Sequence, residues 1–472
     1  MNKKLFLLLF ASIGCMGWGQ TALWEMPTIL SDTSIVRHWR VHEYIVYSRQ
    51  GAGPGTVSYH DNAAGTNKTV ILPSGVVIND FCIANDTVFA GGSLESGTNK
   101  FGLIACFAIN DIVNGAGTFH AHQFDYEMMD VGCCFTNDYQ NLITGITRIA
   151  PFRDGGVTRV AFIADNIIVN RFNPDEVIYY RKGYGDIAYT ASGWDTGEFH
   201  YDKYGVEEYS DIAVTPSKIV IVAQSNDSSL FRFQVFNKQK GYAKCLYSGY
   251  ATKRYCYSDT RLLGYPMVTS LAGDTIVVAY HGISPTIAYC LSVKEFDVSG
   301  SLPVMTGSLE IPMSGSYNAD WKVRDIRYIR LHNMLLVLHD VPSPITSNWG
   351  SYIYEIDLGN MYAGMYNSVF LHNHGTLYSL DIFNQDGFIV SVRDNPLGDL
   401  FIYNEAIHSP VTCGHSETVA KGKATSPTMS QLSRYQCSIQ LNPLSVNHNL
   451  IFTVLEEPAY ISCNRMLNMN NK

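Results

Sequence analysis

Short apolar runs, broken at intervals by Gly, Asn, Asp and Ser, follow one another along most of the chain. Within many runs apolar and polar positions alternate, which is the period of a half-buried β-strand. One unit recurs: an apolar strand, a tight turn, a second strongly apolar strand, a loop rich in Gly, Ser and Asn, and a third alternating strand. The copy that begins at Ile78 reads INDFCIANDTVFAGGSLESGTNKFGLIACFAI and contains all of these parts. The pattern predicts an all-β protein.

Further copies of this unit can be aligned with the one at Ile78, and those at Arg37 and Asp130 are the weakest. The copies begin at Arg37, Ile78, Asp130, Tyr209, Val268, Val323 and Leu377. The pairs Asn85-Asp86, Gly273-Asp274 and Asp386-Gly387 separate two apolar runs. A hairpin needs residues that tolerate positive φ at such places, so these pairs are predicted turns.

An acidic residue recurs at one position of the predicted first strand. The equivalent positions are Asp80, Asp130, Asp211, Val268, Asp325 and Asp381, at spacings of 50, 81, 57, 57 and 56 residues. The spacing of 81 residues between Asp130 and Asp211 predicts either a degenerate extra unit or a long insertion around residues 179–204. We interpret the repeated Asp as a group that satisfies backbone N–H groups near a turn. The alternative is that it lines a rim or channel.

A three- or four-stranded unit cannot bury both of its faces alone, and radial packing of such units solves this problem. The repeat over roughly residues 30–410 therefore resembles a β-propeller, whose blades need roughly 40–50 residues each. We predict seven blades, with six and eight as alternatives. The chain is similar to exported bacterial propeller proteins of unassigned role. It lacks the WD dipeptide and the sialidase-type Asp box. A two-domain β-sandwich remains an alternative, whereas the repeats are too long for a parallel β-helix.

Composition narrows the class of protein. The chain has 472 residues, 46% of them hydrophobic and 16% charged, and a net charge of −9. A disordered chain would be less hydrophobic, and a nucleic-acid-binding protein would carry a basic balance or stripe. We therefore expect a globular protein whose partner is an unknown protein or glycan, with no nucleic acid. The acidic balance favours neutral or cationic partners.

The N-terminus has the pattern of a secretory signal. Lys3 and Lys4 precede the apolar stretch Leu5–Ile13, and Gly-Trp-Gly ends at Gly19. This predicts a signal peptide over residues 1–19 and an exported protein, secreted or associated with the bacterial surface. The alternative is a lipid anchor at Cys15. Later apolar runs are short and interrupted, so no integral membrane segment is expected. The predicted domains are a propeller over residues 20–407 and a C-terminal extension over residues 408–472, which includes a Ser/Thr-rich loop and potential ring-closing strands.

Export permits disulfides. Cys245 and Cys256 flank a segment that reads as a hairpin and are the preferred candidate pair, with two unbridged strand cysteines as the alternative. Cys82, Cys106 and Cys290 lie in apolar strand patterns and are interpreted as small buried hydrophobic residues.

Candidate metal ligands are few. His120 and His122 are two apart on a predicted strand and so face the same side, with Asp125 close behind as a third ligand. The alternative is an exposed loop between blades. His372 and His374 repeat the spacing. Motifs for serine hydrolases, zinc proteases, phosphate-binding loops and dinucleotide binding are missing, so no cofactor is predicted.

Aromatic residues crowd the Gly- and Asp-rich stretch 179–209, and Tyr184, Tyr189, Trp194 and Tyr201 are the candidate binding residues. Exposed, they would form a platform for sugar rings or peptides; buried, they would fill the space between blades. The leading hypothesis is an exported, non-catalytic binding protein that uses one face of a propeller. The alternatives are an extracellular carbohydrate-active enzyme, hydrolase or lyase, with channel carboxylates, and a structural subunit of a surface assembly.

Overall fold

The computed structural model describes most of the strands and several of the connections between them. The described residues are 21–25, 34–41, 44–50, 56–61, 66–97, 99–128, 139–202, 207–225, 231–242, 245–251, 266–282, 290–312, 322–330, 333–342, 349–359, 366–371, 376–384, 387–393, 400–404, 429–431, 436–440 and 447–458. The predicted signal peptide and Cys15 lie outside these residues.

Consecutive antiparallel strands form sets of four. The first half of the chain contributes β2 (Ser34–Val41), β3 (Tyr44–Gln50), β4 (Thr56–Asp61), β5 (Thr66–Ile71), β6 (Val76–Ala84), β7 (Thr87–Ser96), β8 (Asn99–Ala108), β9 (Ala116–Gln123), β11 (Tyr139–Asp154), β12 (Val157–Asn170), β13 (Asn173–Thr190) and β14 (Gly193–Asp202). A short strand, β10 (Glu127–Met128), adds to β11. A helix, α2 (Ile109–Asn114), follows β8, and a 3-10 turn, η2 (Lys240–Tyr242), follows β17.

The same arrangement continues in the second half. Its strands are β15 (Glu207–Val214), β16 (Lys218–Ser225), β17 (Phe231–Asn237), β18 (Cys245–Ala251), β19 (Met267–Ser270), β20 (Thr275–Gly282), β21 (Cys290–Asp297), β22 (Val304–Pro312), β23 (Lys322–Ile329), β24 (Met334–Pro342), β25 (Trp349–Asp357), β26 (Tyr366–Leu371), β27 (Thr376–Asn384), β28 (Gly387–Arg393) and β29 (Leu400–Asn404).

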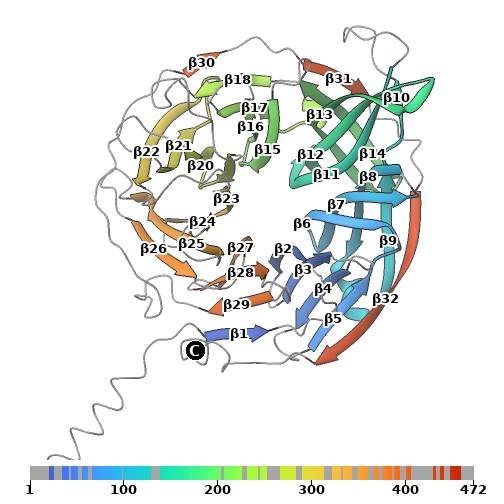
Figure 1. The fold of residues 1–472 in the computed structure, drawn as a ribbon, viewed down its shortest axis with the longest axis horizontal. Helices are drawn as coiled ribbons and strands as arrows, with labels where there is room; N and C mark the ends of the chain where they lie inside the picture. The colour runs from blue at the N-terminus through green and yellow to red at the C-terminus, as the bar shows by residue number, and fades with distance from the viewer. Residues whose placement is uncertain are drawn as a thin grey trace, which may run out of the picture.

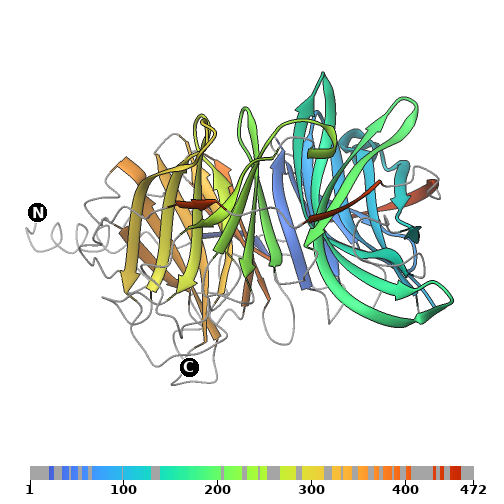
Figure 2. The same ribbon diagram turned by 90° about the horizontal axis from the view of Figure 1, so that it is seen from above.

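The sets are arranged as blades around a centre (Figures 1 and 2). The first strand of each set, β2, β6, β11, β15, β19, β23 and β27, lies innermost and contacts the first strands of the neighbouring sets. Apolar clusters fill the space between adjacent blades: one joins β15–β17 to β19–β21, and another joins β19–β22 to β23–β25. Because such clusters bury the faces of neighbouring sheets and the sheets surround one centre, the arrangement is a β-propeller, and the predicted fold class is confirmed.

The ring is closed by the N-terminal strand. β1 (Thr21–Glu25) pairs antiparallel with β29, so the last set has the order β1-β29-β28-β27. Ring-closing strands were expected in residues 408–472, but the strand that pairs with β29 is β1. An exposed outer edge would attract other strands, and β1 covers it with a segment of the same chain.

The described strands of the C-terminal extension pair with the outer edges of other blades. β30 (Met429–Gln431) adds to β18, and β31 (Gln436–Gln440) adds to β14. β32 (Asn447–Pro458) pairs first with β9 and then with β5, which joins two blades into one nine-stranded sheet. These red strands lie on the outer rim in Figure 1. The described strands of the extension therefore cover edges that would otherwise be exposed.

The blade β11–β14 accounts for the wide interval in the repeat. β11, β12 and β13 have 16, 14 and 18 residues, so the added chain length lies within long strands. Asp130 lies outside the described residues. Asp80 and Asp211 each directly follow a bulge in the first strand of their blades. β11 has two bulges, and Arg148 follows the second of them. β27 also has two, and Ser379, not Asp381, follows the first. The sequence alignment of these two blades was therefore wrong.

Two predicted turns are confirmed in detail. Asn85 and Asp86 have φ values of 49° and 58°, and Gly273 has a φ of 70°. Asn and Asp tolerate this left-handed region better than most residues, which is why a two-residue hairpin connection forms between β6 and β7. The third predicted turn includes Asp386, which lies outside the described residues.

Candidate functional site

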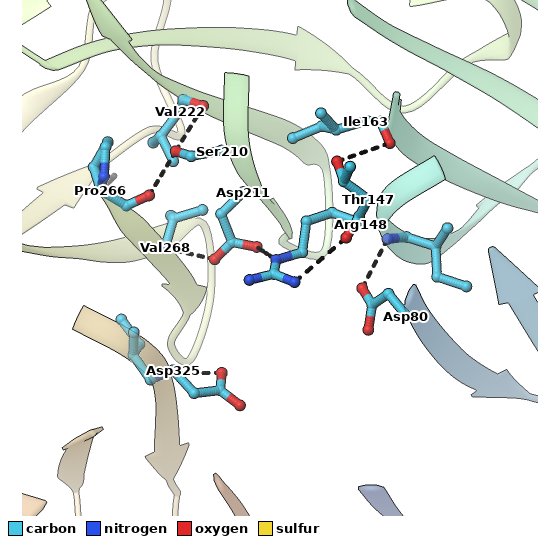
Figure 3. Close-up of polar contacts among 12 residues, drawn as sticks. Asp80, Thr147, Arg148, Ile163, Ser210, Asp211, Val222, Pro266, Val268 and Asp325 are labelled. Carbon is cyan, nitrogen blue, oxygen red and sulfur yellow. Dashed lines mark hydrogen bonds and ion pairs between the residues drawn. The ribbon is translucent and has the colours of Figure 1, made fainter. Parts of the chain in front are cut away.

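The inner strands carry carboxylates that tie one blade to the next. Asp80 of β6 accepts the N–H of Phe81 at 3.0 Å and, across the blade boundary, the N–H of Ile149 at 2.9 Å. Asp211 of β15 likewise accepts the N–H of Val268 of β19 at 2.9 Å. Figure 3 shows both contacts. The interpretation of the repeated Asp as a partner of backbone N–H groups is confirmed at these positions.

Asp325 of β23 follows a strand bulge in its blade, as Asp80 and Asp211 do in theirs. It accepts the N–H of Ile326 at 2.9 Å and the Nη1 of Arg327 at 2.7 Å. Asp80, Asp211 and Asp325 are all buried. Each of these side chains therefore already serves the backbone or a neighbouring cation.

Arg148 occupies the corresponding position of β11. Its guanidinium extends towards Asp211, and its Nε lies 3.7 Å from Oδ1 of that carboxylate (Figure 3). Its Nη1 donates to the carbonyl oxygen of Thr147 at 3.3 Å. Asp211 therefore both accepts the Val268 N–H of the next blade and forms an ion pair with Arg148 of the preceding one.

A cavity of about 180 Å³, the channel cavity, lies between the inner strands β11, β15, β19 and β23. Its charged lining residues are Arg148, Lys182 and Arg324. Ser210 also lines the cavity, and its hydroxyl donates a hydrogen bond to the carbonyl oxygen of Pro266 at 2.7 Å. The channel cavity therefore has a cationic wall in a protein of net charge −9.

A larger cavity of about 460 Å³, the arm cavity, lies beside the hairpin of β12 and β13. We call residues 166–182 of this hairpin the arm. Asn166, Val177 and Tyr180 of the arm line the cavity, together with Lys100 and Glu208 from neighbouring blades. Asp165 and Lys182 also line it and form an ion pair at 3.9 Å. Burial raises the pKa of the Asp165 carboxyl, against the opposing effect of Lys182. Lys182 lines both cavities, which places them next to one another.

The arm exposes aromatic side chains. Phe172 is 77% exposed, Tyr180 is 75% exposed and Tyr179 is 40% exposed. The guanidinium of Arg181 lies over the Tyr179 ring, 4.6 Å from its centroid. Three of the six large apolar side chains found exposed among the described residues lie on the arm, and the other three are Val157, Leu302 and Val304. Exposed aromatic rings beside a cavity are typical of a binding surface.

The aromatic residues selected from the sequence lie elsewhere. Tyr184 and Tyr201 are fully buried, and Trp194 is nearly so. Tyr184 packs edge-on against Tyr209 at a centroid distance of 5.1 Å, and Tyr189 packs against Trp194 at 5.0 Å. The structure thus supports the packing interpretation for these rings. Tyr179 and Tyr180 belong to the same aromatic cluster of the sequence and are the exposed members, but they were not among the residues selected as candidate binding residues.

The candidate metal ligands have mainly aromatic neighbours. The His120 ring stacks on Tyr189 at 4.8 Å, and the buried His122 ring packs against Phe124 at 4.8 Å. Asp125 accepts the N–H of Tyr126 at 2.7 Å. Within the part of the chain that the structure describes, no three His, Cys, Asp or Glu side chains are grouped so that they could hold a metal ion. His372 and His374 lie outside that part.

The cysteines fall into two groups. Cys82, Cys106 and Cys290 are buried in strands, as expected, and burial raises the pKa of the Cys106 thiol far above its usual range. Cys245 begins β18, and Cys256 lies outside the described residues. The pairing of Cys245 with Cys256 stays a prediction.

Comparisons with known proteins assign the chain to no family. No protein-family model and no curated protein matches the sequence. Among solved structures, the chain is similar to a Dos1 propeller, at 9% identity and a TM-score of 0.42, over 83% of this chain and 96% of that one. It is also similar to the WD40 domain of coronin from Toxoplasma gondii, at 10% identity and a TM-score of 0.40, over 84% and 86% of the two chains. The fold assignment rests on the sheets themselves. Among the described helices, none is long and apolar enough to cross a membrane.

Proposed function

We propose that this propeller is a non-catalytic binding protein whose ligand docks on the arm and in the arm cavity. The observation that carries the proposal is the exposed ring of Tyr180, which lines a cavity of about 460 Å³ on an arm that also exposes Phe172 and Tyr179. That volume lies within the range of roughly 300–1,000 Å³ found for small-ligand sites. Loops and hairpins at one end of a rigid scaffold are where propellers and other folds present their binding residues.

The ligand class that fits this surface is a glycan. The exposed ring of Tyr180 suits stacking on a sugar ring, and the cavity that it lines adds hydrogen-bonding groups from Asn166, Asp165 and Lys182. The exposed apolar area is confined to a few rings, whereas a stable protein partner would need a larger continuous surface.

The inner-strand carboxylates support binding over hydrolysis. A glycosidase needs two carboxyl groups about 5–10 Å apart that both act on the substrate. Asp80 and Asp211 instead accept backbone N–H groups across blade boundaries, and Asp325 holds Arg327. Removing any of these from its present role would leave a buried donor or cation without its partner.

We also propose that the protein is exported. The support is the N-terminal pattern of lysines, an apolar stretch and small residues before Gln20. The intact mass of the exported protein distinguishes cleavage before Gln20 from a lipid-modified Cys15, and a mass that retains residues 1–19 would overturn export by this route.

Replacing Tyr180 by Ala tests the arm. A panel of neutral and acidic polysaccharides is offered to the wild type and to Tyr180→Ala, and bound protein and newly formed sugar ends are measured in the same wells. We expect retention without new ends, weakened about 5- to 10-fold by the substitution, because a stacking ring contributes about 1 kcal/mol.

Leu302→Ala is the matched control, since Leu302 is also exposed, at 55%, but lies away from the arm on the connection before β22. It should bind as the wild type does. New sugar ends in any well would overturn the non-catalytic proposal. Equal losses in both variants, or no retention on any polysaccharide, would overturn the assignment of the arm as a glycan surface.

A further inference from the structure

The channel cavity is small, and all of its charged lining residues are cationic. Its charged lining residues come from three strands: Arg148 from β11, Lys182 from β13 and Arg324 from β23. The remaining lining residues are neutral, among them Thr147, Ser210 and Tyr209. At about 180 Å³ it has room for a small anion with some water, but not for a polysaccharide.

The hydroxyl groups of the cavity wall already have acceptors. Thr147 Oγ1 donates to the carbonyl oxygen of Ile163 at 3.3 Å, and Ser210 Oγ to that of Pro266 at 2.7 Å. The cationic side chains therefore dominate what the wall offers to a ligand. A guanidinium in particular presents a planar fork that matches the oxygen atoms of a carboxylate or phosphate.

Carboxylates near the cavity position these cations. Asp211 holds Arg148 at 3.7 Å while its other oxygen accepts the Val268 N–H at 2.9 Å, and Asp165 holds Lys182 at 3.9 Å. The N–H groups of a guanidinium or an ammonium can form charge-assisted hydrogen bonds to the oxygen atoms of a small anion in the cavity. Glu208 lines the adjacent arm cavity and not the channel cavity.

We propose that the channel cavity is a binding site for a small oxyanion, a phosphate or a carboxylate, held by Arg148, Lys182 and Arg324. The net charge of −9 repels anions at long range, so the affinity comes from the local cluster and from the low-dielectric walls that concentrate its field. The site shares Lys182 with the glycan surface proposed for the arm, whereas Arg148 and Arg324 line the channel cavity and not the arm cavity.

Titration calorimetry at constant ionic strength tests the site with inorganic phosphate, acetate and glucuronic acid as separate probes. We expect phosphate or acetate to bind the wild type, and Arg148→Met to weaken binding at least tenfold, because charge-assisted hydrogen bonds are lost. If glucuronic acid binds more tightly than acetate, the anionic group is one that a sugar carries. If the two bind equally, or phosphate binds more tightly than either, the ligand is a free small anion.

Arg153→Met is the matched control, because Arg153 is exposed at the other end of β11 and bonds to Asn85 Oδ1 at 2.8 Å. Arg324→Gln is a second site variant, in case Arg148→Met does not fold. The two site variants should lose the probes and the control should keep them. No binding of any probe to the folded wild type, or equal weakening in Arg153→Met, would overturn the proposal, while the polysaccharide retention by the arm would stand unaffected.

Discussion

Acidifying the solution from about pH 7 to about pH 5 is expected to destabilise the propeller, because three histidines are buried away from water. His122 lies on β9 against Phe124, while His281 of β20 and His339 of β24 face each other with ring centroids 5.5 Å apart. Burial lowers the pKa of His122 and of His281 from 6.5 to about 4. Burial, and then the proximity of His281, lowers the pKa of His339 well below its usual range.

A histidine whose pKa is lower in the folded state binds its proton more readily when the chain unfolds. Its contribution to stability is fully present above the unfolded pKa of 6.5, and is lost as the pH falls from there towards about 4. At about pH 5 each of His122 and His281 has lost about 2 kcal/mol, and His339 adds to this loss. Set against a total stability of roughly 5–15 kcal/mol, the combined effect is large.

Urea unfolding followed by tryptophan fluorescence at the two pH values measures the effect. His281→Gln should reduce the difference in unfolding free energy between them by about 2 kcal/mol, since glutamine does not titrate. Val278→Ala, a buried change on the same strand, should lower stability by the same amount at both pH values. The reasoning is refuted if His281→Gln retains the whole wild-type difference, or if the wild type is equally stable at both pH values.

Two further predictions concern how the blades are joined. Asp80→Ala should lower the free energy of unfolding by about 2–3 kcal/mol because the Ile149 N–H loses a buried charged acceptor, whereas Asp80→Asn should cost less; equal losses in urea titrations would contradict this. Removing residues 429–472 uncovers the outer edges that β30, β31 and β32 protect, and should produce oligomers in size-exclusion chromatography; a monomer as stable as the full chain would show that the edges need no cover.

The blade architecture was predictable because the strands and turns of each blade are encoded within one short, continuous stretch of sequence. The Ile78 copy contains β6, β7 and β8 in order, joined by a turn at Asn85-Asp86 that has the expected positive φ values. Ring closure was not predictable in the same way. β1 pairs with β29 across almost the whole chain, and nothing in residues 21–25 alone specifies that partner.

Strand bulges and strand lengths explain the errors in the alignment of the repeats. A bulge shifts the register by one residue, so Ser379 follows the bulge in β27 although Asp381 looks equivalent in the sequence. In the long blade, the residue after the second of the two bulges of β11 is Arg148, a cation where the repeat suggested an acid. Sequence spacing treats every unit as if its strands had equal length, and β13 with 18 residues departs from this.

In the candidate site, too, features set by nearby residues could be predicted from the sequence, whereas features set by the fold could not. Tyr180 and Tyr184 lie four residues apart on one strand, yet Tyr180 is 75% exposed and Tyr184 is fully buried, because β13 leaves the arm and enters the blade between them. Aromatic content alone could not separate them. The cations of the channel cavity pose a harder problem, since Arg148 and Arg324 are brought to one wall only by the closure of the ring. An overall charge of −9 predicts a preference for cationic partners, but a local group of three cations can reverse that preference within a single cavity.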